Sequence, residues 1–302
     1  MFSPIFYDPR QNVAGMTGFS PSAGKPQRFV DLMGHHNFRS YGAPHLGLVV
    51  PVDRQDLYRV HDARYVDEVF TGTTLNGFEN NDPRVPEACL WTIGSLLAAA
   101  CWALANPLSP GCSPSSGFHH AGTSWGGGYC TFNGLMVVAA KLIAENPSIK
   151  IGILDCDMHY GDGTADILSG HPVMGQSILH RTSGKHFYGD NPPEEALEFQ
   201  AWLHHSIEEL NDFGCDVVLY QAGADMHIQD PLGGFLDDAG MALRDRTVFA
   251  GLEAGIAWNL AGGYRTSTDI FSDPVLATHY TTLKAAQVRE SARAAKLKGV
   301  PA

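Results

Sequence analysis

Cysteine is scarce in this chain of 302 residues, and its spacing fits no metal or redox motif. The six cysteines stand at positions 89, 101, 112, 130, 156 and 215, so the sequence contains no CxxC pair. This spacing indicates neither a zinc ribbon nor a disulfide framework, and we expect reduced thiols.

Basic residues are also few. The chain has 20 lysines and arginines against 32 aspartates and glutamates, which gives a formal net charge of −12. Such a balance argues against nucleic acid as a direct partner, because an acidic surface repels the phosphate backbone. It favours the attraction of cationic substrates.

The N-terminal residues, MFSPIFYDPR, lack the basic segment and long apolar core of a signal peptide, so the cytoplasm is the expected location. One charge-free run, from 88 to 105, is nearly long enough to span a membrane. Its alanine content favours a helix buried in a soluble core, and so does the absence of a basic residue between the end of the run and Lys141. We therefore expect no membrane partner.

Short apolar runs and helical patterns alternate along the chain. We expect strands at 4–7, 149–154, 176–181, 216–221 and 254–259, and helices at 26–34, after Asp53 and Asp62, at 88–105, 132–145, 163–169, 194–211 and 237–250, and from about 276. Loops are expected at 71–86 and 106–128. The alternation predicts an α/β fold with a mostly parallel central sheet and helices on both faces, in a single domain over residues 1–302.

The run IGILDCDMHYGDGT, from 151 to 164, places polar residues at the end of a predicted buried strand. Side chains alternate along a strand, so Asp155, Asp157 and His159 should point the same way. Carboxylates and an imidazole at this spacing suit a divalent cation, usually zinc. A surface ion pair is the alternative interpretation of these residues alone.

Three more polar clusters follow predicted strands or lie in adjoining loops. They are His119-His120, the run from Gln221 to Asp225, and the run from Leu260 to Tyr264. Separately they could be a solvated loop, a helix N-cap and a tight turn. Their recurrence at equivalent places predicts an active site, because ligands of parallel sheets bind beyond the carboxyl ends of the strands.

The motifs GFHHA, GGYCTFNG, ILDCDMHYGDGT, QAGADMHIQDPLGG and NLAGGY follow one another in this order. Together, from about His61 to Tyr264, they resemble the histone deacetylase and acetylpolyamine amidohydrolase superfamily, which includes bacterial histone-deacetylase-like amidohydrolases. The resemblance implies an arginase-like (deacetylase-like) fold. It also implies a zinc-dependent hydrolase that removes acyl groups, usually acetyl, from amines.

The resemblance further implies a single catalytic metal. Its ligands would be Asp157, His159 and Asp225, holding one Zn²⁺ per chain, with Fe²⁺ as a possible substitute. Three protein ligands leave an open position for water and the substrate carbonyl.

The catalytic groups are implied in the same way. His119 and His120 match the family's histidine pair, in which His120 would be the general base and then the acid for the leaving amine. Asp155 and Asp162 match the carboxylates behind these two histidines. Tyr264 matches the tyrosine whose hydroxyl donates to the oxyanion.

Four residues match the family's substrate tunnel. Tyr129 and Phe187 would form its aromatic walls, although ordinary core packing is the alternative for both rings. Gly128 would place its carbonyl beside the substrate amide. Leu232 would stand at the tunnel mouth, where it offers no partner to a second ammonium and so favours an acyl-lysine peptide or protein over an acetylated polyamine.

Some positions depart from the pattern. Ile178 stands where many members have a serine that helps to bind a structural potassium ion, which makes that K⁺ site uncertain. The loop at 71–86 matches no known rim motif, although Glu79 and Asp82 are candidate carboxylates for a substrate.

Two competing interpretations follow from the same residues. A binuclear manganese hydrolase of the arginase type would need further carboxylates where Gly161 and His227 stand, so a single metal is expected. A catalytically silent relative would have lost a ligand, a histidine or the tyrosine, and none is lost. The sequence leaves the oligomeric state open, a homo-oligomer included.

Overall fold

The computed structural model describes residues 3–13, 15, 22–35, 48–289 and 291. Among these residues, five strands form one sheet in the order β1-β5-β4-β2-β3, and all neighbouring pairs are parallel. The strands are β1 (Gly111–Ser113), β2 (Ile151–Cys156), β3 (Ile178–Thr182), β4 (Val217–Ala222) and β5 (Gly255–Asn259). The expected α/β fold with a parallel sheet is confirmed.

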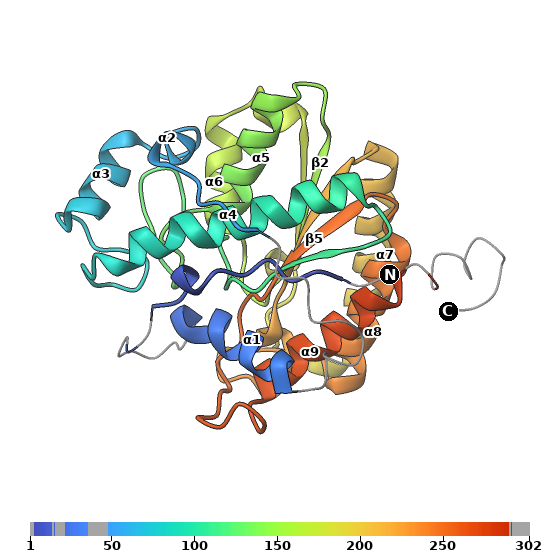
Figure 1. Cartoon of the computed structure of the whole chain (residues 1–302). Helices are drawn as coiled ribbons and strands as arrows, with labels where there is room; N and C mark the ends of the chain where they lie inside the picture. The colour runs from blue at the N-terminus through green and yellow to red at the C-terminus, as the bar shows by residue number, and fades with distance from the viewer. Residues whose placement is uncertain (1–2, 14, 16–21, 36–47, 290, 292–302) are drawn as a thin grey trace.

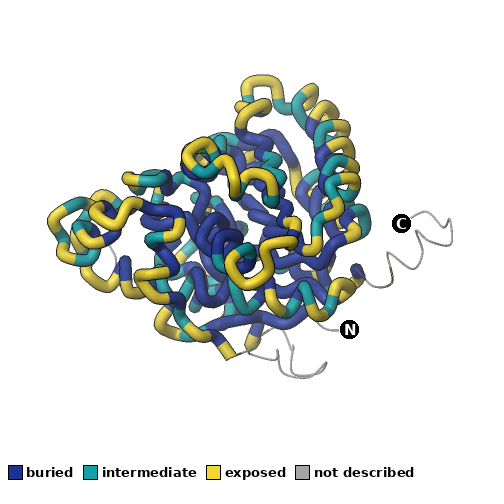
Figure 2. The backbone as a smooth tube through the Cα atoms, turned by 90° about the horizontal axis from the view of Figure 1, so that it is seen from above, coloured by how far each residue is buried: buried dark blue, intermediate teal, exposed yellow. Residues whose placement is uncertain are grey.

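Alternate residues of the central strands face two different helical layers. On one face, Leu154, Tyr220 and Trp258 pack with helices α1 (Lys25–His35), α7 (Pro192–Phe213), α8 (Asp238–Gly251) and α9 (Pro274–Gln287). On the other face, Ile153, Leu219 and Ala257 pack with α2 (Arg54–Leu57), α3 (Ala63–Thr71), α4 (Arg84–Ala105), α5 (Gly134–Glu145) and α6 (Asp162–Gly170). Figure 1 shows the two layers, and Figure 2 shows that the backbone in the middle of the molecule is buried while exposed stretches lie around it. Both faces are covered, as parallel sheets require.

Several helix ends follow from the sequence. Asp53 caps α2, because its side chain accepts the N–H of Asp56 at 3.0 Å. Asp62 precedes α3 as expected, but its side chain makes no capping hydrogen bond. Gly72 and Gly214 end α3 and α7 in the left-handed conformation, with φ of 71° and 75°, which glycine adopts without steric cost.

The N-terminal strand and one loop differ from expectation. Instead of a strand at 4–7, the chain forms one isolated parallel bridge between Ile5 and Cys112. Its partner β1 lies inside the segment 106–128, which was expected to be a loop. The strand was not expected because its residues Gly-Cys-Ser include no β-branched side chain. Helix α4 begins at Arg84 rather than 88, since a proline such as Pro86 is tolerated in a first turn.

Helix α4 is the one described helix that is long and apolar enough to cross a membrane by length and composition. In the fold its inner face is buried, with Ile93, Leu96 and Ala100 in the cluster that covers one side of the sheet. The backbone of a neighbouring segment approaches so closely that a Cβ on Gly94 would lie 2.1 Å from the carbonyl oxygen of Val50. This packing is that of a core helix, as expected.

Candidate active site

The predicted metal ligands lie just beyond two adjacent strands. β2 ends at Cys156, so Asp157 and His159 stand in the following loop. Asp155, Asp157 and His159 were expected to alternate along one strand, but only Asp155 belongs to it. β4 ends at Ala222, and Asp225 lies in a short 3-10 turn, Ala224–Met226. The structure brings the ligand atoms of the three predicted residues to within 4.8 Å of one another.

This cluster has the chemistry of a divalent-cation site. His159 Nδ1 lies 3.2 Å from Asp157 Oδ1 and 3.1 Å from Asp225 Oδ2. Both carboxylates are buried, Asp157 being 2% and Asp225 0% exposed. Burial, together with the neighbouring charge of Asp157, raises the pKa of Asp225 above its usual range. A bound cation would relieve this repulsion, and two oxygens with one nitrogen are ligands that zinc or iron accepts.

The predicted histidine pair lies beside the cluster, and each ring is held by a carboxylate. His119 Nδ1 donates to Asp155 at 2.8 Å, and His120 Nδ1 donates to Asp162 at 2.7 Å. The two ring centroids are 4.1 Å apart. Burial opposes a charge on His119, but Asp155 and Asp157 outweigh it and raise the pKa of His119 to about 9. The two carboxylates orient both rings through Nδ1, which leaves Nε2 of His120 for the reacting groups.

Tyr264 completes the group from the loop after β5. Its ring centroid lies 6.4 Å from that of His159 and 5.7 Å from that of Tyr129. Burial, and then the charge of Asp225, raise the pKa of Tyr264, so its hydroxyl stays protonated and can donate a hydrogen bond. The preceding Gly262 is required for space, because a Cβ there would lie 2.3 Å from Asp225 Oδ1.

Gly128 and Tyr129 bring the backbone of a glycine-rich loop close to the histidines. Gly128 has a φ of 51°, and a Cβ on it would lie 2.4 Å from His120 Cδ2. Tyr129 has a φ of 64°, which is uncommon for a residue with a side chain. Its N–H donates to Gly77 at 3.0 Å. Both residues therefore border the predicted site, while their roles toward a substrate stay predictions.

A small pocket of about 20 Å³ lies where these groups meet, and His119, Gly128, Tyr129, Asp157 and Tyr264 are among its lining residues. Five residues predicted from four motifs thus share one chamber.

The other two predicted tunnel residues, Phe187 and Leu232, do not line this cavity. Phe187 is 5% exposed, and its ring packs against Phe199, Trp202 and Phe235 with centroids 5.5 to 6.1 Å away. These contacts are those of an aromatic core, which was the alternative interpretation, and a wall role for Phe187 stays a prediction. Leu232 is 39% exposed, so it reaches solvent as a residue at a tunnel mouth would.

The two candidate rim carboxylates differ in their surroundings. Asp82 accepts hydrogen bonds from the side chain of Arg84 at 2.9 and 3.0 Å, so its charge is already paired. Glu79 is exposed. Burial is the main cause that raises the pKa of Tyr129, and the charge of Glu79 is the second cause. Of the two, Glu79 is therefore the carboxylate near the site.

Two buried side chains that support the site had not been assigned to it. Lys25 of α1 lines the small cavity, and its ammonium donates to the carbonyls of Leu260, at 3.2 Å, and Gly262. Burial lowers the pKa of Lys25 to about 8, against the opposing effect of Asp225. A lone lysine 235 and 237 residues away from its two partners leaves no signal in a sequence. Gln221, which donates to Asp155 at 3.1 Å, does lie within a recognised motif.

Neither position of a second metal carries a carboxylate. A Cβ on Gly161 would lie 2.6 Å from Asp155 Oδ2, and His227 pairs with Asp238 at 3.1 Å. At the position where potassium was in question, Ile178 is buried and its side chain offers no oxygen. It pairs with Ile151 at the start of β2, whereas Ser183, directly after β3, donates its hydroxyl to the carbonyl of Asp157 at 2.9 Å. A structural potassium ion stays a prediction.

Comparisons with known proteins agree with this geometry. Residues 32–272 match the family model described as the histone deacetylase domain. The chain is 29% identical over 230 residues to an uncharacterised protein of Picosynechococcus, covering 70% of this chain and 76% of that one. It is 30% identical over 138 residues to the acetylpolyamine amidohydrolase of Mycoplana ramosa, covering 39% of this chain and 40% of the relative.

Solved structures share the fold at low sequence identity. The HDA15 HD domain superposes with a TM-score of 0.73 at 20% identity, covering 95% of this chain and 90% of that one. The acetylpolyamine aminohydrolase of Burkholderia pseudomallei gives a TM-score of 0.69 at 17% identity, covering 95% and 98%. With the domain match over most of its length, this chain belongs to the histone deacetylase domain family.

Proposed function

We propose that this protein is a zinc-dependent amidohydrolase that removes acetyl or other acyl groups from the ε-amino group of lysine in peptides or proteins. Family membership and the named relatives indicate a deacetylase or amidohydrolase, while the metal and the substrate are our proposal. The observation that carries it is the cluster of Asp157, His159 and Asp225, beside which the rings of His120 and Tyr264 lie with centroids 6.0 and 6.4 Å from that of His159.

Each residue has a defined task in this reaction. When bound by the three ligands, zinc would polarise the acyl carbonyl and lower the pKa of water. His120 Nε2 takes the proton of the attacking water and returns it to the leaving amine, while Asp162 holds its Nδ1–H. The hydroxyl of Tyr264 donates to the developing oxyanion.

The surroundings favour a neutral amide on an apolar stem. Tyr129 borders the chamber and can cover a four-carbon stem, whose burial is favourable once acylation has removed the charge at its end. Leu232 at the mouth gives a second ammonium no partner. These features support an acyl-lysine substrate.

Acetylated polyamines are the second candidate substrate. The net charge of −12 attracts polycations, exposed Glu79 lies near Tyr129, and one relative is named acetylpolyamine amidohydrolase. Charge of this kind steers encounter but is screened over about 8 Å at physiological salt. We therefore rank polyamines second.

A panel of acyl-lysine peptides and acetylated polyamines, run with and without chelator, tests the proposal. We expect chelator-sensitive release of acyl groups, with a higher kcat/KM for at least one acyl-lysine peptide than for any polyamine. Faster turnover of acetylspermidine than of every peptide would make polyamines the substrate. No turnover of any compound after zinc reconstitution would overturn the function.

A further inference from the structure

Asp230 ties together two loops of the site. Its Oδ1 accepts the N–H of Leu232 at 3.0 Å, and its Oδ2 accepts the N–H groups of Tyr264 at 2.7 Å and Arg265 at 3.3 Å. The residue is only 9% exposed. One carboxylate thus joins the loop after β4, which carries the ligand Asp225, to the loop after β5, which carries the tyrosine.

The backbone before Tyr264 needs such an anchor. Gly262 and Gly263 have φ of 50° and 88°, and a chain of two such glycines has few steric restraints. Lys25 holds the carbonyls of Leu260 and Gly262, but these bonds lie upstream of the tyrosine.

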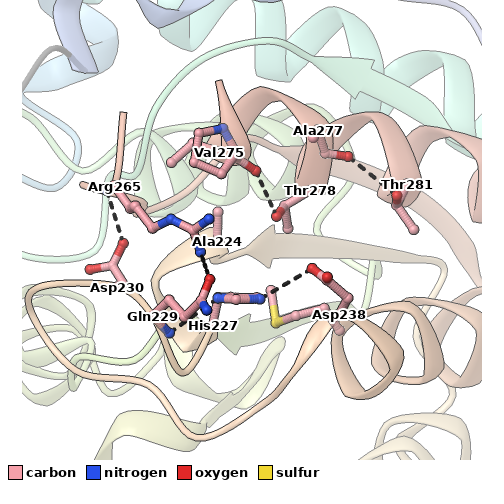
Figure 3. A pocket seen from close by; sticks show the side chains of 12 residues that line it. Ala224, His227, Gln229, Asp230, Asp238, Arg265, Val275, Ala277, Thr278 and Thr281 are labelled. Carbon is pink, nitrogen blue, oxygen red and sulfur yellow. Dashed lines mark hydrogen bonds and ion pairs between the residues drawn. The ribbon is translucent and has the colours of Figure 1, made fainter. Parts of the chain in front are cut away.

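The end of this segment borders a cavity. Asp230 and Arg265 line this cavity of about 310 Å³, whose further lining includes Ala224, His227, Gln229, Asp238, Thr278 and Thr281 (Figure 3). Gly263 is packed, because a Cβ on it would lie 2.7 Å from Val275 Cγ1 and 3.0 Å from Ala224 Cβ. The cavity therefore adjoins the segment at Arg265, directly after the tyrosine. Figure 3 shows the hydrogen bond from Arg265 to Asp230 at the edge of this cavity.

We propose that Asp230 is a positioning residue that sets the hydroxyl of Tyr264 for oxyanion stabilisation and couples it to Leu232 at the rim. The inference rests on the proposed function. Hydrogen bonds to a carboxylate are about twice as strong as neutral ones, and a reacting group displaced by ~1 Å can lose about 10²-fold in rate. A carboxylate that accepts the N–H of Tyr264 itself is therefore placed to control turnover.

Two substitutions separate the parts of this clamp. Asp230→Ala removes all the acceptor oxygens. Asp230→Asn keeps one oxygen but turns the other into an NH₂ donor, which must face an N–H of Leu232 or of the tyrosine segment. We expect Asp230→Ala to lower kcat by roughly 10- to 100-fold, and Asp230→Asn by less, with metal content unchanged in both.

A double-mutant cycle tests whether Asp230 acts through the tyrosine. In the Tyr264→Phe background, with the hydroxyl already gone, either substitution at Asp230 should lower kcat by less than about threefold. Equal losses in both backgrounds would overturn the proposal, because they would show that Asp230 acts independently of the hydroxyl. Asp230→Asn decides the same question if Asp230→Ala does not fold.

Asp238→Asn is the matched control, because it makes the same chemical change at the same cavity. The side chain of Asp238 is 99% exposed and pairs with His227 rather than with Tyr264. We expect its kcat to stay within about twofold of the wild type.

Hydrogen exchange gives a readout that does not need activity. The amides at 260–266 should exchange faster in Asp230→Ala than in the wild type, and at the wild-type rate in Asp238→Asn. Unchanged exchange in Asp230→Ala would overturn the clamp. A wild type without hydrolytic activity would instead defeat the proposed function, while the exchange result still decides whether the clamp exists.

Discussion

The floor of the site and its rim are built differently. On the floor, His119, Asp155, Asp157 and Asp225 are at most 2% exposed, and all of them make hydrogen bonds or ion pairs with other floor groups. On the rim, Leu232 is 39% exposed, and Glu79 is exposed too. A buried charge that loses its partner costs several kcal/mol, whereas an exposed side chain can change at little cost. The comparison teaches that chemistry should depend on the floor and substrate choice on the rim.

The largest effects should follow from removing a floor ligand. Asp157→Ala or Asp225→Ala takes one of three ligands from the cluster, so we expect no bound metal and no turnover above background. Elemental analysis and a peptide assay check this. Asp82→Asn, which removes a charge on the rim side that is paired with Arg84, is the control and should keep both. Full metal content in either ligand variant would break the distinction between floor and rim.

Next come the reacting groups beside the floor that do not bind the metal. His120→Ala removes the proton shuttle and Tyr264→Phe removes the oxyanion donor, and each should lower kcat by at least ~10²-fold. Metal content should equal that of the wild type, because neither residue is a proposed ligand. Near-full turnover in either variant would show that its assigned role is wrong.

A stability effect should come from His61, which is buried and binds the carbonyl of Gly122 in the glycine-rich loop. Its Nδ1 donates to Gly122 at 2.8 Å and its Nε2 accepts the N–H of Asn133 at 3.0 Å, so a second proton has no place. Burial lowers the pKa of His61 to about 4. Below pH ~6.5 the unfolded chain therefore binds a proton that the folded chain does not, and stability falls until about pH 4, by about 3 kcal/mol in total.

Urea unfolding between pH 4 and 7.5 measures this loss. His61→Gln should make the dependence of the unfolding free energy on pH shallower than in the wild type, while exposed His204→Gln should leave it unchanged. Parallel curves for the wild type and His61→Gln would contradict the prediction.

The smallest effect should come from the rim. Leu232→Glu should shift the ratio of kcat/KM values toward acetylpolyamines by roughly tenfold, which equals about 1.4 kcal/mol, because a carboxylate can pair with the second ammonium. Glu79→Gln should shift the ratio slightly the other way, and Asp82→Asn should not shift it. If Leu232→Glu lowered kcat with every substrate, Leu232 would contribute to the chemistry rather than to substrate choice.

The floor was largely predictable from the sequence. The strands before Asp155 and Gln221 are buried on both faces and so appear as apolar runs, and each run ends at its polar residues. Because parallel strands end at the same edge of a sheet, groups from distant motifs were expected to meet there, and they do.

The remaining features depend on packing between distant segments. Lys25 and Asp230 make hydrogen bonds to backbone atoms of the loop after β5. The sequence does not indicate which carbonyl or N–H a given side chain will bind. Phe187 carries the same ring whether it lines a tunnel or packs against Phe199, so its type alone could not decide. Strand β1 has three residues without strand propensity and forms because β5 lies beside it.

A zinc titration of metal-free protein tests the central claim most directly. Acetate release from an acetyl-lysine peptide would be measured at each step, with bound zinc determined by elemental analysis. Asp157, His159 and Asp225 form the one such cluster among the described residues, which predicts that activity rises in proportion to zinc and reaches its plateau at one ion per chain. A plateau at two ions per chain, or no acetate release at full zinc occupancy, would contradict it.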